Sequence, residues 1–331
     1  MRRKGLGFLD PAIDYINSHD RFIITAHETP DGDAIGSECA FYNALRKLGK
    51  EVCILNADPI PDKYTFLDPE GVVTTLEEPD QFTGDLSAFS LVILDTNDIN
   101  NIGQVRDWIL PKTESYFIID HHDQQDVLEN DNCIIEEASS TCEILYELFT
   151  GLSIEISIDI ARPLYVGIVY DTGSFIYPKT SEKTFKIAYN LVKSGVSPNF
   201  VYQKIYESNS ISSLILQSKV LSTLELVFDR QVAIQTMLKE TVIECNAAYE
   251  EADTFINIPL KSEQIVVSIF FKQNLAGILR CSLRSKGEIN VAEIAQYFGG
   301  GGHKTAAGFK CKESIEKSRA YVLKMLEKYF T

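Results

Sequence analysis

The chain has 331 residues, of which 45% are hydrophobic and 24% charged, an ordinary globular composition that excludes disordered and collagen-like chains. Lysine and arginine number 31 against 47 aspartates and glutamates, so the formal net charge is −16. Because binding to long nucleic acid relies on basic patches that neutralise phosphates, this charge argues against such a partner.

The acidic residues are concentrated in the first two thirds of the chain. Residues 1–224 hold 17 basic and 34 acidic residues, whereas residues 225–331 hold 14 and 13. This asymmetry, in a chain long enough for about two domains of ~150 residues, predicts an acidic module followed by a nearly neutral one. We expect a first domain over 1–195, a helical linker over 196–226 and a second domain over 227–331.

The seven cysteines are irregularly spaced and include no Cys-x-x-Cys pair, which argues against a disulfide framework and against a thiolate zinc site. No apolar run approaches the ~20 residues needed to span a membrane, and residues 1–10 lack the apolar segment of a signal peptide. We therefore expect a soluble cytoplasmic protein with no membrane partner.

The first half alternates short apolar runs with helical patterns. The continuous Val, Ile, Leu and Phe runs are typical of strands buried on both faces of a parallel sheet, and they cover 21–27, 51–56, 90–95 and 115–120. Helical patterns cover 34–48, 139–150, 158–170 and 181–193. This alternation predicts βαβ units, and hence an α/β fold with a mostly parallel sheet flanked by helices.

The pattern changes after a polar, mostly helical stretch at 199–226. Strand-like runs follow at 231–237, 264–272 and 277–284, and helical patterns at 290–298 and 312–330. Four glycines, at positions 299–302, come directly after the first of these helices.

Polar side chains follow several predicted strands at their carboxyl ends. These are His27, Asp31 and Asp33 after the first strand, Asp95 after the third, and Asp120, His121 and His122 at the end of the fourth. Because the carboxyl ends of parallel strands open on one crevice, we expect these groups to converge. Asp171, directly after the helical pattern 158–170, can join them from a helix end.

So many carboxylates in one cleft would repel each other unless divalent cations neutralise them. Imidazole and carboxylate without thiolate suit Mn²⁺ or Mg²⁺, and six to eight ligands are enough for two ions. Two such ions ~3.5–4 Å apart would clamp a phosphoryl oxygen and lower the pKa of a bridging water. A single strand-end aspartate is usually a cap, but the His-x3-Asp-x-Asp spacing together with Asp-His-His favours a metal site.

A second cluster lies in the neutral module. A glycine run exposes backbone N–H groups to an anion, although alone it is more often a flexible turn. We expect Ala306-Ala307-Gly308 to open a helix aimed at the same anion. Arg284 and Ser285, at the end of a predicted strand, offer a forked guanidinium cation and a hydroxyl group that suit phosphate. The candidate anion site therefore comprises Arg284, Ser285, Gly300, Gly301, Gly302 and His303.

The motifs together resemble those of the DHH/DHHA1 phosphoesterase family, near its nanoRNase and 3′-phosphoadenosine-5′-phosphate (pAp) phosphatase group. In chain order they are HETPDGDAIGS from His27, LDT around Asp95, Asp120-His121-His122, Asp171-Thr172-Gly173, SLRS from Ser282, and GGGHK from Gly300. The resemblance implies an N-terminal DHH domain with a mostly parallel sheet and a smaller C-terminal α/β DHHA1 domain with a mixed sheet.

The resemblance also implies roles for these residues. One Mn²⁺ would be held by His27, Asp31 and Asp95. A second would be held by Asp33, Asp95, His121 and Asp171. Mg²⁺ is the alternative for both ions. The remaining catalytic residues would be His122, which contacts the scissile phosphate and assists protonation of the leaving group, and Asp120, which orients a neighbouring histidine. The substrate's remote phosphate and base would be held by Arg284, Ser285, the three glycines and His303. Ser139-Ser140-Thr141 sits where related chains have a hydroxyl-rich helix start near the site, and a simple N-cap explains it equally well.

We therefore hypothesise an Mn²⁺-dependent phosphoesterase that acts on short RNA oligonucleotides, on pAp or on both, by attack of a metal-bridging hydroxide on phosphorus. A cyclic or linear dinucleotide (c-di-AMP or pApA) phosphodiesterase is the alternative, and a manganese pyrophosphatase is disfavoured by the glycine-rich His303 module. A non-catalytic nucleotide-binding regulatory module is disfavoured by the intact ligand set. A homodimer stays open, since periodicity does not separate interface from core.

Overall fold

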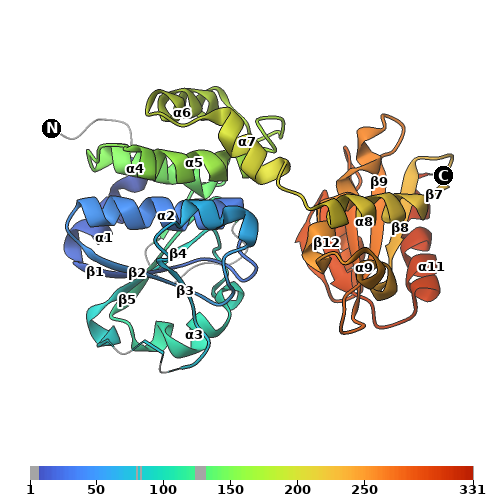
Figure 1. The fold of residues 1–331 in the computed structure, drawn as a ribbon, viewed down its shortest axis with the longest axis horizontal. Coiled ribbons are helices and arrows are strands. Elements are labelled where there is room, and N and C mark those ends of the chain that lie inside the picture. The colour runs from blue at the N-terminus through green and yellow to red at the C-terminus, as the bar shows by residue number, and fades with distance from the viewer. Residues whose placement is uncertain (1–6, 80, 83, 124–131, 331) are drawn as a thin grey trace. The chain divides into compact units, whose positions relative to one another are not determined.

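The computed structural model describes residues 7–79, 81–82, 84–123 and 132–330, and it forms two compact units, Met1–Ser208 and Asn209–Thr331 (Figure 1). The segment 196–226 contains two helices, α7 (Pro198–Tyr206) in the first unit and α8 (Ile211–Ser222) in the second. Within the described residues, no helix combines the length and apolarity needed to cross a membrane.

The first unit is built on a six-stranded sheet in the order β3-β2-β1-β4-β5-β6, in which every strand pair is parallel. The four predicted strands are present, and two short edge strands that carry no comparable apolar run complete the sheet. In chain order they are β1 (Arg21–Thr25), β2 (Glu51–Asn56), β3 (Val73–Thr75), β4 (Ser90–Leu94), β5 (Ser115–Asp120) and β6 (Asn132–Ile134).

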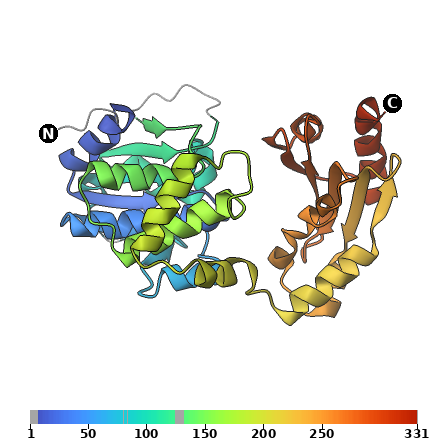
Figure 2. The ribbon, with the colours of Figure 1, turned by 90° about the horizontal axis from the view of Figure 1, so that it is seen from above.

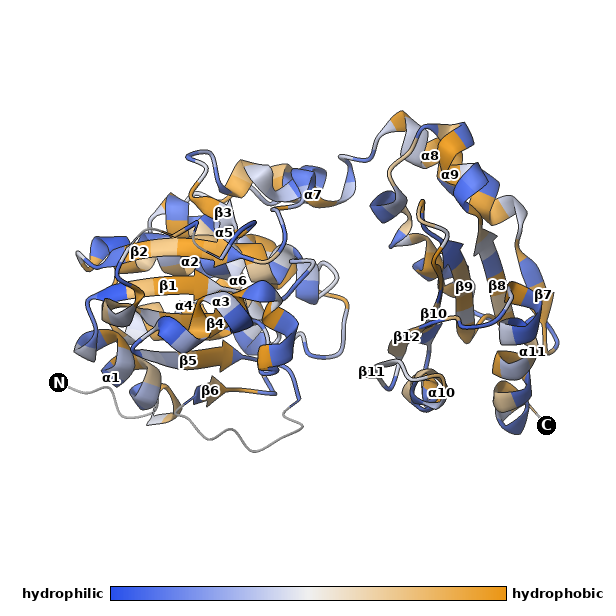
Figure 3. Cartoon of the chain, turned by 90° about the horizontal axis from the view of Figure 1, so that it is seen from below, coloured by the Kyte–Doolittle hydropathy of each residue, from blue (hydrophilic) through white to orange (hydrophobic). Residues whose placement is uncertain are grey.

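Helices cover both faces of this sheet because successive strand residues point to opposite sides. Phe22 and Ile24 of β1 pack under α2 (Gly32–Lys47), α4 (Thr141–Gly151) and α5 (Ile158–Asp171), whereas Ile23 faces the cluster that includes Val105 of α3 (Gln104–Trp108). Figure 1 shows α2, α4 and α5 on one face and α3 on the other, and Figure 3 shows the hydrophobic stretches along β1 and β2. The helices α1 (Asp10–Ser18) and α6 (Glu182–Lys193) complete the first unit.

The order of the strands positions the site. From β1 the chain runs outward through β2 and β3, then returns to β4 on the other side of β1 and continues outward through β5 and β6. In an open parallel sheet such a reversal leaves a crevice outside the carboxyl ends of the two central strands. The ends of β1 and β4 are the segments that carry His27 and Asp95.

The second unit is a mixed six-stranded sheet in the order β11-β12-β10-β9-β8-β7, in which β8 and β9 are parallel and the other pairs antiparallel. The helices α8 and α9 (Lys239–Cys245) contribute to one core cluster, and α10 (Val291–Tyr297) and α11 (Ile315–Leu326) to a second one. Figure 2 shows this sheet and its helices from yellow to red. The strands are β7 (Glu225–Val227), β8 (Val232–Met237), β9 (Val267–Gln273), β10 (Leu279–Ser285), β11 (Gly301–His303) and β12 (Ala306–Lys310).

The prediction that Ala306-Ala307-Gly308 opens a helix is wrong, because these residues begin strand β12. Burial alternates along β12, with Ala307 and Phe309 inward, and both of its edges are paired, with β10 and with β11. Ladder hydrogen bonds on two sides and a strand-period apolar pattern outweigh the local helix propensity of two alanines.

Candidate metal centre

The turn between β1 and α2 uses Asp31 in two ways. Its Oδ1 accepts hydrogen bonds from the backbone N–H groups of Asp33 (2.9 Å) and Ala34 (3.2 Å), which caps α2. Its Oδ2 lies 4.0 Å from His27 Nε2. The cap and the ligand interpretations of this aspartate are therefore compatible, because each uses a different carboxylate oxygen.

Asp95 lies at the centre of the cluster, directly after β4, and its carboxylate is almost fully buried. Its carboxylate oxygens lie 3.6 Å from His27 Nε2 and 3.5 Å from His121 Nε2. The backbone φ of Asp95 is +63°, in the left-handed region that aspartate tolerates better than most residues. Asp95 is thus shared between the β1 side and the β5 side of the crevice.

The N-terminus of α4 holds the next carboxylate. The backbone N–H groups of Thr141 and Cys142 donate to Asp33 Oδ2 (2.6 Å) and Oδ1 (3.1 Å). The Thr141 hydroxyl also donates to Asp95 Oδ1 (3.0 Å). Since a helix N-terminus carries partial positive charge, α4 stabilises the negative charge of both aspartates and fixes their positions.

His121 and Asp171 complete this side of the centre. His121 Nε2 lies 2.9 Å from Asp171 Oδ2 and 3.9 Å from Asp33 Oδ2, and neither contact has hydrogen-bond geometry. Asp171 is the last residue of α5, so a helix end delivers this carboxylate to a cluster otherwise built from strand ends.

Asp120 and His122 form a hydrogen-bonded pair beside Asp95, whose Oδ1 lies 3.9 Å from His122 Nδ1. Asp120 Oδ1 accepts hydrogen bonds from His122 Nδ1 (2.8 Å) and from the His121 backbone N–H (2.8 Å), while its Oδ2 accepts one from Asn97 Nδ2 (2.8 Å). Asn97 Nδ2 also lies 3.2 Å from the His122 carbonyl oxygen. Asp120 is therefore occupied in orienting His122, whose side chain is 39% exposed and lies at the surface of the cluster.

The donor atoms of this cluster fit divalent cations. The Nδ1 atoms of His27 and His121 face the backbone carbonyls of Glu28 (2.8 Å) and Ala138 (3.4 Å), so each Nδ1 carries the hydrogen. In the neutral rings the Nε2 lone pairs then face carboxylates, an arrangement that a cation stabilises and that metal-binding histidines use. Among the described residues, three groups of ligand atoms lie within 4.8 Å of one another: His27, Asp31 and Asp95; Asp33, His121 and Asp171; and Asp95, Asp120, His121 and His122.

The protonation equilibria reflect the same crowding. Burial raises the pKa of Asp33 to about 6 and that of Asp95 well above its usual range, with repulsion from the neighbouring aspartates adding to both shifts. Burial alone would lower the pKa of His121, but the nearby Asp171 and Asp33 carboxylates raise it to about 9. Bound cations would remove this repulsion and keep the carboxylates ionised.

Thr141 belongs to the Ser-Ser-Thr stretch that the resemblance placed near the site. The N-cap interpretation holds for Ser140, and Thr141 contacts Asp33 and Asp95. Two residues of this centre, Asn97 and Gly167, were missed in the sequence. Asn97 follows the Leu-Asp-Thr motif and was available as a polar strand-end residue. Gly167 has no sequence signal, yet a Cβ there would lie 2.4 Å from Asp33 Oδ1, so only glycine allows α5 to approach this carboxylate.

The second unit brings together part of the predicted anion site. The backbones of Arg284, Ala306 and His303 form one row across β10, β12 and β11. The Ser285 hydroxyl donates to the Ile289 carbonyl oxygen (2.7 Å), and one Arg284 Nη1 contact is with the Leu283 carbonyl (3.0 Å). The side chain of His303 lies outside the described part of the chain.

The glycine run is more ordered than a flexible turn. The Gly300 N–H bonds to the Ala295 carbonyl (2.9 Å), and a Cβ there would lie 2.2 Å from the Gly308 carbonyl oxygen. Gly301 and Gly302 belong to β11, where they pair with Gly308 and Ala307 of β12. Gly300 and Gly302 therefore permit the close approach of the glycine run to β12.

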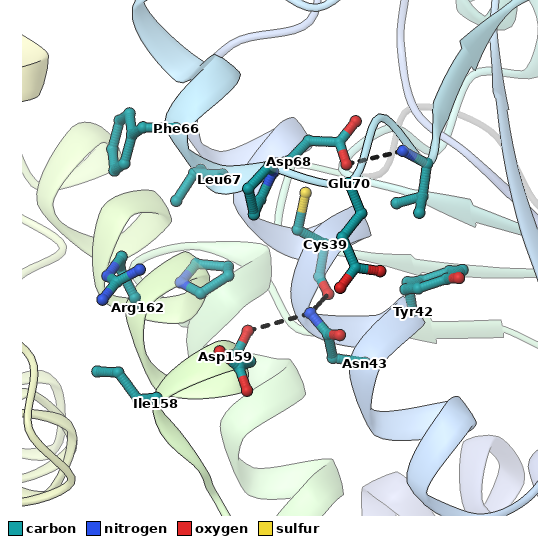
Figure 4. A pocket seen from close by; sticks show the side chains of 13 residues that line it. Cys39, Tyr42, Asn43, Phe66, Leu67, Asp68, Glu70, Ile158, Asp159 and Arg162 are labelled. Carbon is teal, nitrogen blue, oxygen red and sulfur yellow. Dashed lines mark hydrogen bonds between the residues drawn. The ribbon is translucent and has the colours of Figure 1, made fainter.

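A hollow on the first unit, lined in part by Cys39, Asn43 and Asp68, contains none of the predicted site residues (Figure 4). The Asp68 carboxylate accepts hydrogen bonds from the backbone N–H groups of Val72 (2.8 Å) and Val73 (2.9 Å). Asn43 Nδ2 donates to the Cys39 and Asp159 carbonyls. These polar side chains bond to backbone groups of the surrounding loops and helices, so we assign them structural roles.

Fold and site together define a two-domain α/β protein with a carboxylate–histidine centre at the switch point of a parallel sheet. The family model described as "DHH family, N-terminal domain" matches residues 21–168, and that of the "DHHA1 domain" matches residues 230–331. The chain therefore belongs to the DHH/DHHA1 family, as the sequence motifs predicted.

Curated relatives extend over most of the chain. The bifunctional oligoribonuclease and PAP phosphatase NrnA of Thermus thermophilus is 28% identical over 303 residues, covering 90% of this chain and 86% of that protein. The protein of the same name from Bacillus subtilis is 28% identical over 302 residues, covering 88% and 90%. The crystal structure of an exopolyphosphatase-related protein from Bacteroides fragilis superposes with a TM-score of 0.90 at 26% identity, covering 98% of this chain and 97% of that one.

Proposed function

We propose that this protein is a hydrolase of phosphoester bonds that acts on small nucleotides, namely short RNA oligonucleotides and pAp. The relatives named for oligoribonuclease and PAP phosphatase activities align over nearly the whole chain, which supports this substrate class. The observation that carries the proposal is that the ligand group His27, Asp31 and Asp95 adjoins the group Asp33, His121 and Asp171, because Asp95 Oδ1 lies 3.5 Å from His121 Nε2. Seven thiols without a disulfide fit a reducing compartment, so we propose the cytoplasm as its location.

We propose that His27, Asp31 and Asp95 hold one divalent cation and that Asp33, Asp95, His121 and Asp171 hold a second, with Mn²⁺ as the preferred metal and Mg²⁺ as the alternative. When bound, such ions supply Lewis acidity and lower the pKa of a coordinated water. The carboxylates fix the positions of the ions, and the N-terminus of α4 fixes two of the carboxylates.

His122 is the residue we propose for proton transfer to the leaving oxygen. Asp120 accepts from its Nδ1, so Nε2 is the nitrogen that can carry the exchanged proton in this orientation. In the second unit, Arg284, Ser285, His303 and the adjacent glycines are proposed to bind the substrate's remote end. The net charge of −16 favours substrates with few phosphates over long strands.

The test is a substrate panel assayed with Mn²⁺ and separately with Mg²⁺. We expect turnover of pAp and of RNA dinucleotides to exceed that of cyclic-di-AMP, its linear product pApA and pyrophosphate. Faster hydrolysis of cyclic-di-AMP or pApA than of pAp and RNA dinucleotides would transfer the assignment to dinucleotide phosphodiesterases. Tight nucleotide binding with no turnover of any panel member in either metal would refute the enzyme assignment.

A further inference from the structure

We propose that Lys179 is a specificity-determining residue that binds the scissile phosphate and favours a terminal phosphomonoester over an internal phosphodiester. This inference rests on the proposed function, because it concerns which of the two proposed substrate classes Lys179 favours. The loop after α5 contacts the backbone of the Asp-His-His motif through Lys179.

Lys179 Nζ donates a hydrogen bond to the His121 carbonyl oxygen (3.2 Å). That carbonyl joins His121, whose ring faces Asp33, Asp95 and Asp171, to His122, whose ring lies at the surface of the cluster. The exposed Lys179 therefore brings an ammonium group to the edge of an otherwise acidic centre. An ammonium has three N–H donors, so contact with one carbonyl is compatible with contacts to phosphate oxygens.

The loop that carries Lys179 is held by its own hydrogen bonds. The Thr172 hydroxyl accepts from the Phe175 N–H (2.9 Å), and the Thr172 carbonyl accepts from the N–H groups of Ile176 and Tyr177 (2.9 Å each). The Tyr177 carbonyl then accepts from the Thr180 N–H (3.0 Å). These bonds hold the loop backbone from Asp171 to Thr180, and the bond to the His121 carbonyl places the ammonium beside the Asp-His-His motif.

The far end of the loop is tied to the helix that organises the centre. Ser181 caps α6 in a reciprocal box with Thr184, and the Thr184 hydroxyl donates to Glu143 Oε2 (2.7 Å). Glu143 is fully buried in the first turn of α4 and also accepts from the Ser139 hydroxyl (2.6 Å). The N-terminal turn of α4 also donates hydrogen bonds to Asp33 and Asp95. The loop that carries Lys179 and these carboxylates are therefore held by the same helix.

Charge explains the expected selectivity. The second pKa of a phosphate monoester is near 6, so a terminal phosphate carries close to two negative charges at neutral pH, while a diester carries one. A lysine beside the scissile phosphate therefore stabilises the monoester more strongly, in a centre whose carboxylates repel it. Charge-assisted hydrogen bonds of this kind correspond to roughly 10–100-fold in binding or rate.

The experiment compares Lys179→Met, Lys179→Arg and Lys47→Met in the full chain loaded with Mn²⁺. Lys47 is a matched control because its Nζ also donates to a backbone carbonyl, that of Glu155 (3.0 Å). It lies at the C-terminal end of the 16-residue α2, about 24 Å along the helix axis from Asp31 at 1.5 Å per residue. The readouts are kcat and KM on pAp and on an RNA dinucleotide, and the affinity for inorganic phosphate by calorimetry.

We expect Lys179→Met to lower kcat/KM on pAp at least about 10-fold and on the dinucleotide no more than about 3-fold, and to weaken phosphate binding. Lys179→Arg should retain most of the pAp activity, and Lys47→Met should match the unmodified protein. Equal losses on both substrates, or no loss, would overturn the inference while leaving the proposed function intact. If the unmodified protein hydrolyses neither substrate, the proposed function fails, and unchanged phosphate affinity in Lys179→Met would reject the lysine's role independently.

Discussion

Replacing Gly167 with alanine should damage the metal centre without unfolding the protein. The new Cβ would lie 2.4 Å from Asp33 Oδ1 and 2.3 Å from Cys142 Sγ, both far inside van der Waals contact. Relief requires a shift of about 1 Å in α5, α4 or the carboxylate, and overpacking of this kind costs about 1–3 kcal/mol. The higher helix propensity of alanine offsets about 1 kcal/mol of that cost.

We therefore expect Gly167→Ala to lose at most about 2 kcal/mol of stability. Because a displacement of about 1 Å at reacting groups can reduce rates by about 100-fold, phosphoester hydrolysis should fall by about that factor. The assays are urea unfolding followed by circular dichroism, Mn²⁺ binding by calorimetry, and kcat on pAp. Gly151→Ala is the matched control, since its Cβ would meet only the end of the Ile13 side chain at 3.2 Å.

A double variant separates packing from chemistry. Cys142→Ala removes the sulfur that a Cβ at position 167 meets, but it leaves the Asp33 oxygen in place. Gly167→Ala combined with Cys142→Ala should regain stability and should not regain activity or metal affinity. Full activity in the single variant, with unchanged Mn²⁺ binding, would refute the argument that this close approach positions Asp33.

Three further predictions concern the same unit. Asp95→Asn should abolish measurable hydrolysis and weaken Mn²⁺ binding at both ligand groups by calorimetry, whereas loss of one ion with the other retained would contradict a shared ligand. Thr141→Val removes the hydroxyl that donates to Asp95 and should lower kcat roughly 10-fold, while Thr141→Ser should keep most of it. Burial raises the pKa of Glu38 to about 8, so the folded state holds this proton more tightly than the unfolded state does. The free energy of unfolding therefore falls as pH rises from about 4.5 to about 8. Glu38→Gln keeps an acceptor for Asn56. It should be more stable than the unmodified protein by a few kcal/mol at pH 8, with little difference at pH 4.5. The same stability difference between the two proteins at both pH values, measured by urea denaturation, would disprove this.

Most of the elements could be predicted from local patterns. The run from Glu51 to Asn56 is a strand with the predicted bounds, and the helical pattern that begins at Ile158 is α5. Long periodic segments are recognisable because their burial repeats along the chain. The edge strands β3 and β6 were not predicted, since three residues are too few for a pattern and they form by pairing with the strand beside them.

Residue types and their spacing were enough to predict the groups that could bind metal and their positions after strand ends, because these are local properties of the chain. The contacts of these groups could be known only from the folded chain: Asp33 accepts from two N–H groups of α4, Asp120 bonds to His122, and α5 passes close enough to require Gly167. These contacts join residues far apart in the chain, and their geometry depends on how helices pack over the sheet. The kind of chemistry can therefore be predicted from residue types and their order in the chain, whereas the orientation of each side chain follows from packing.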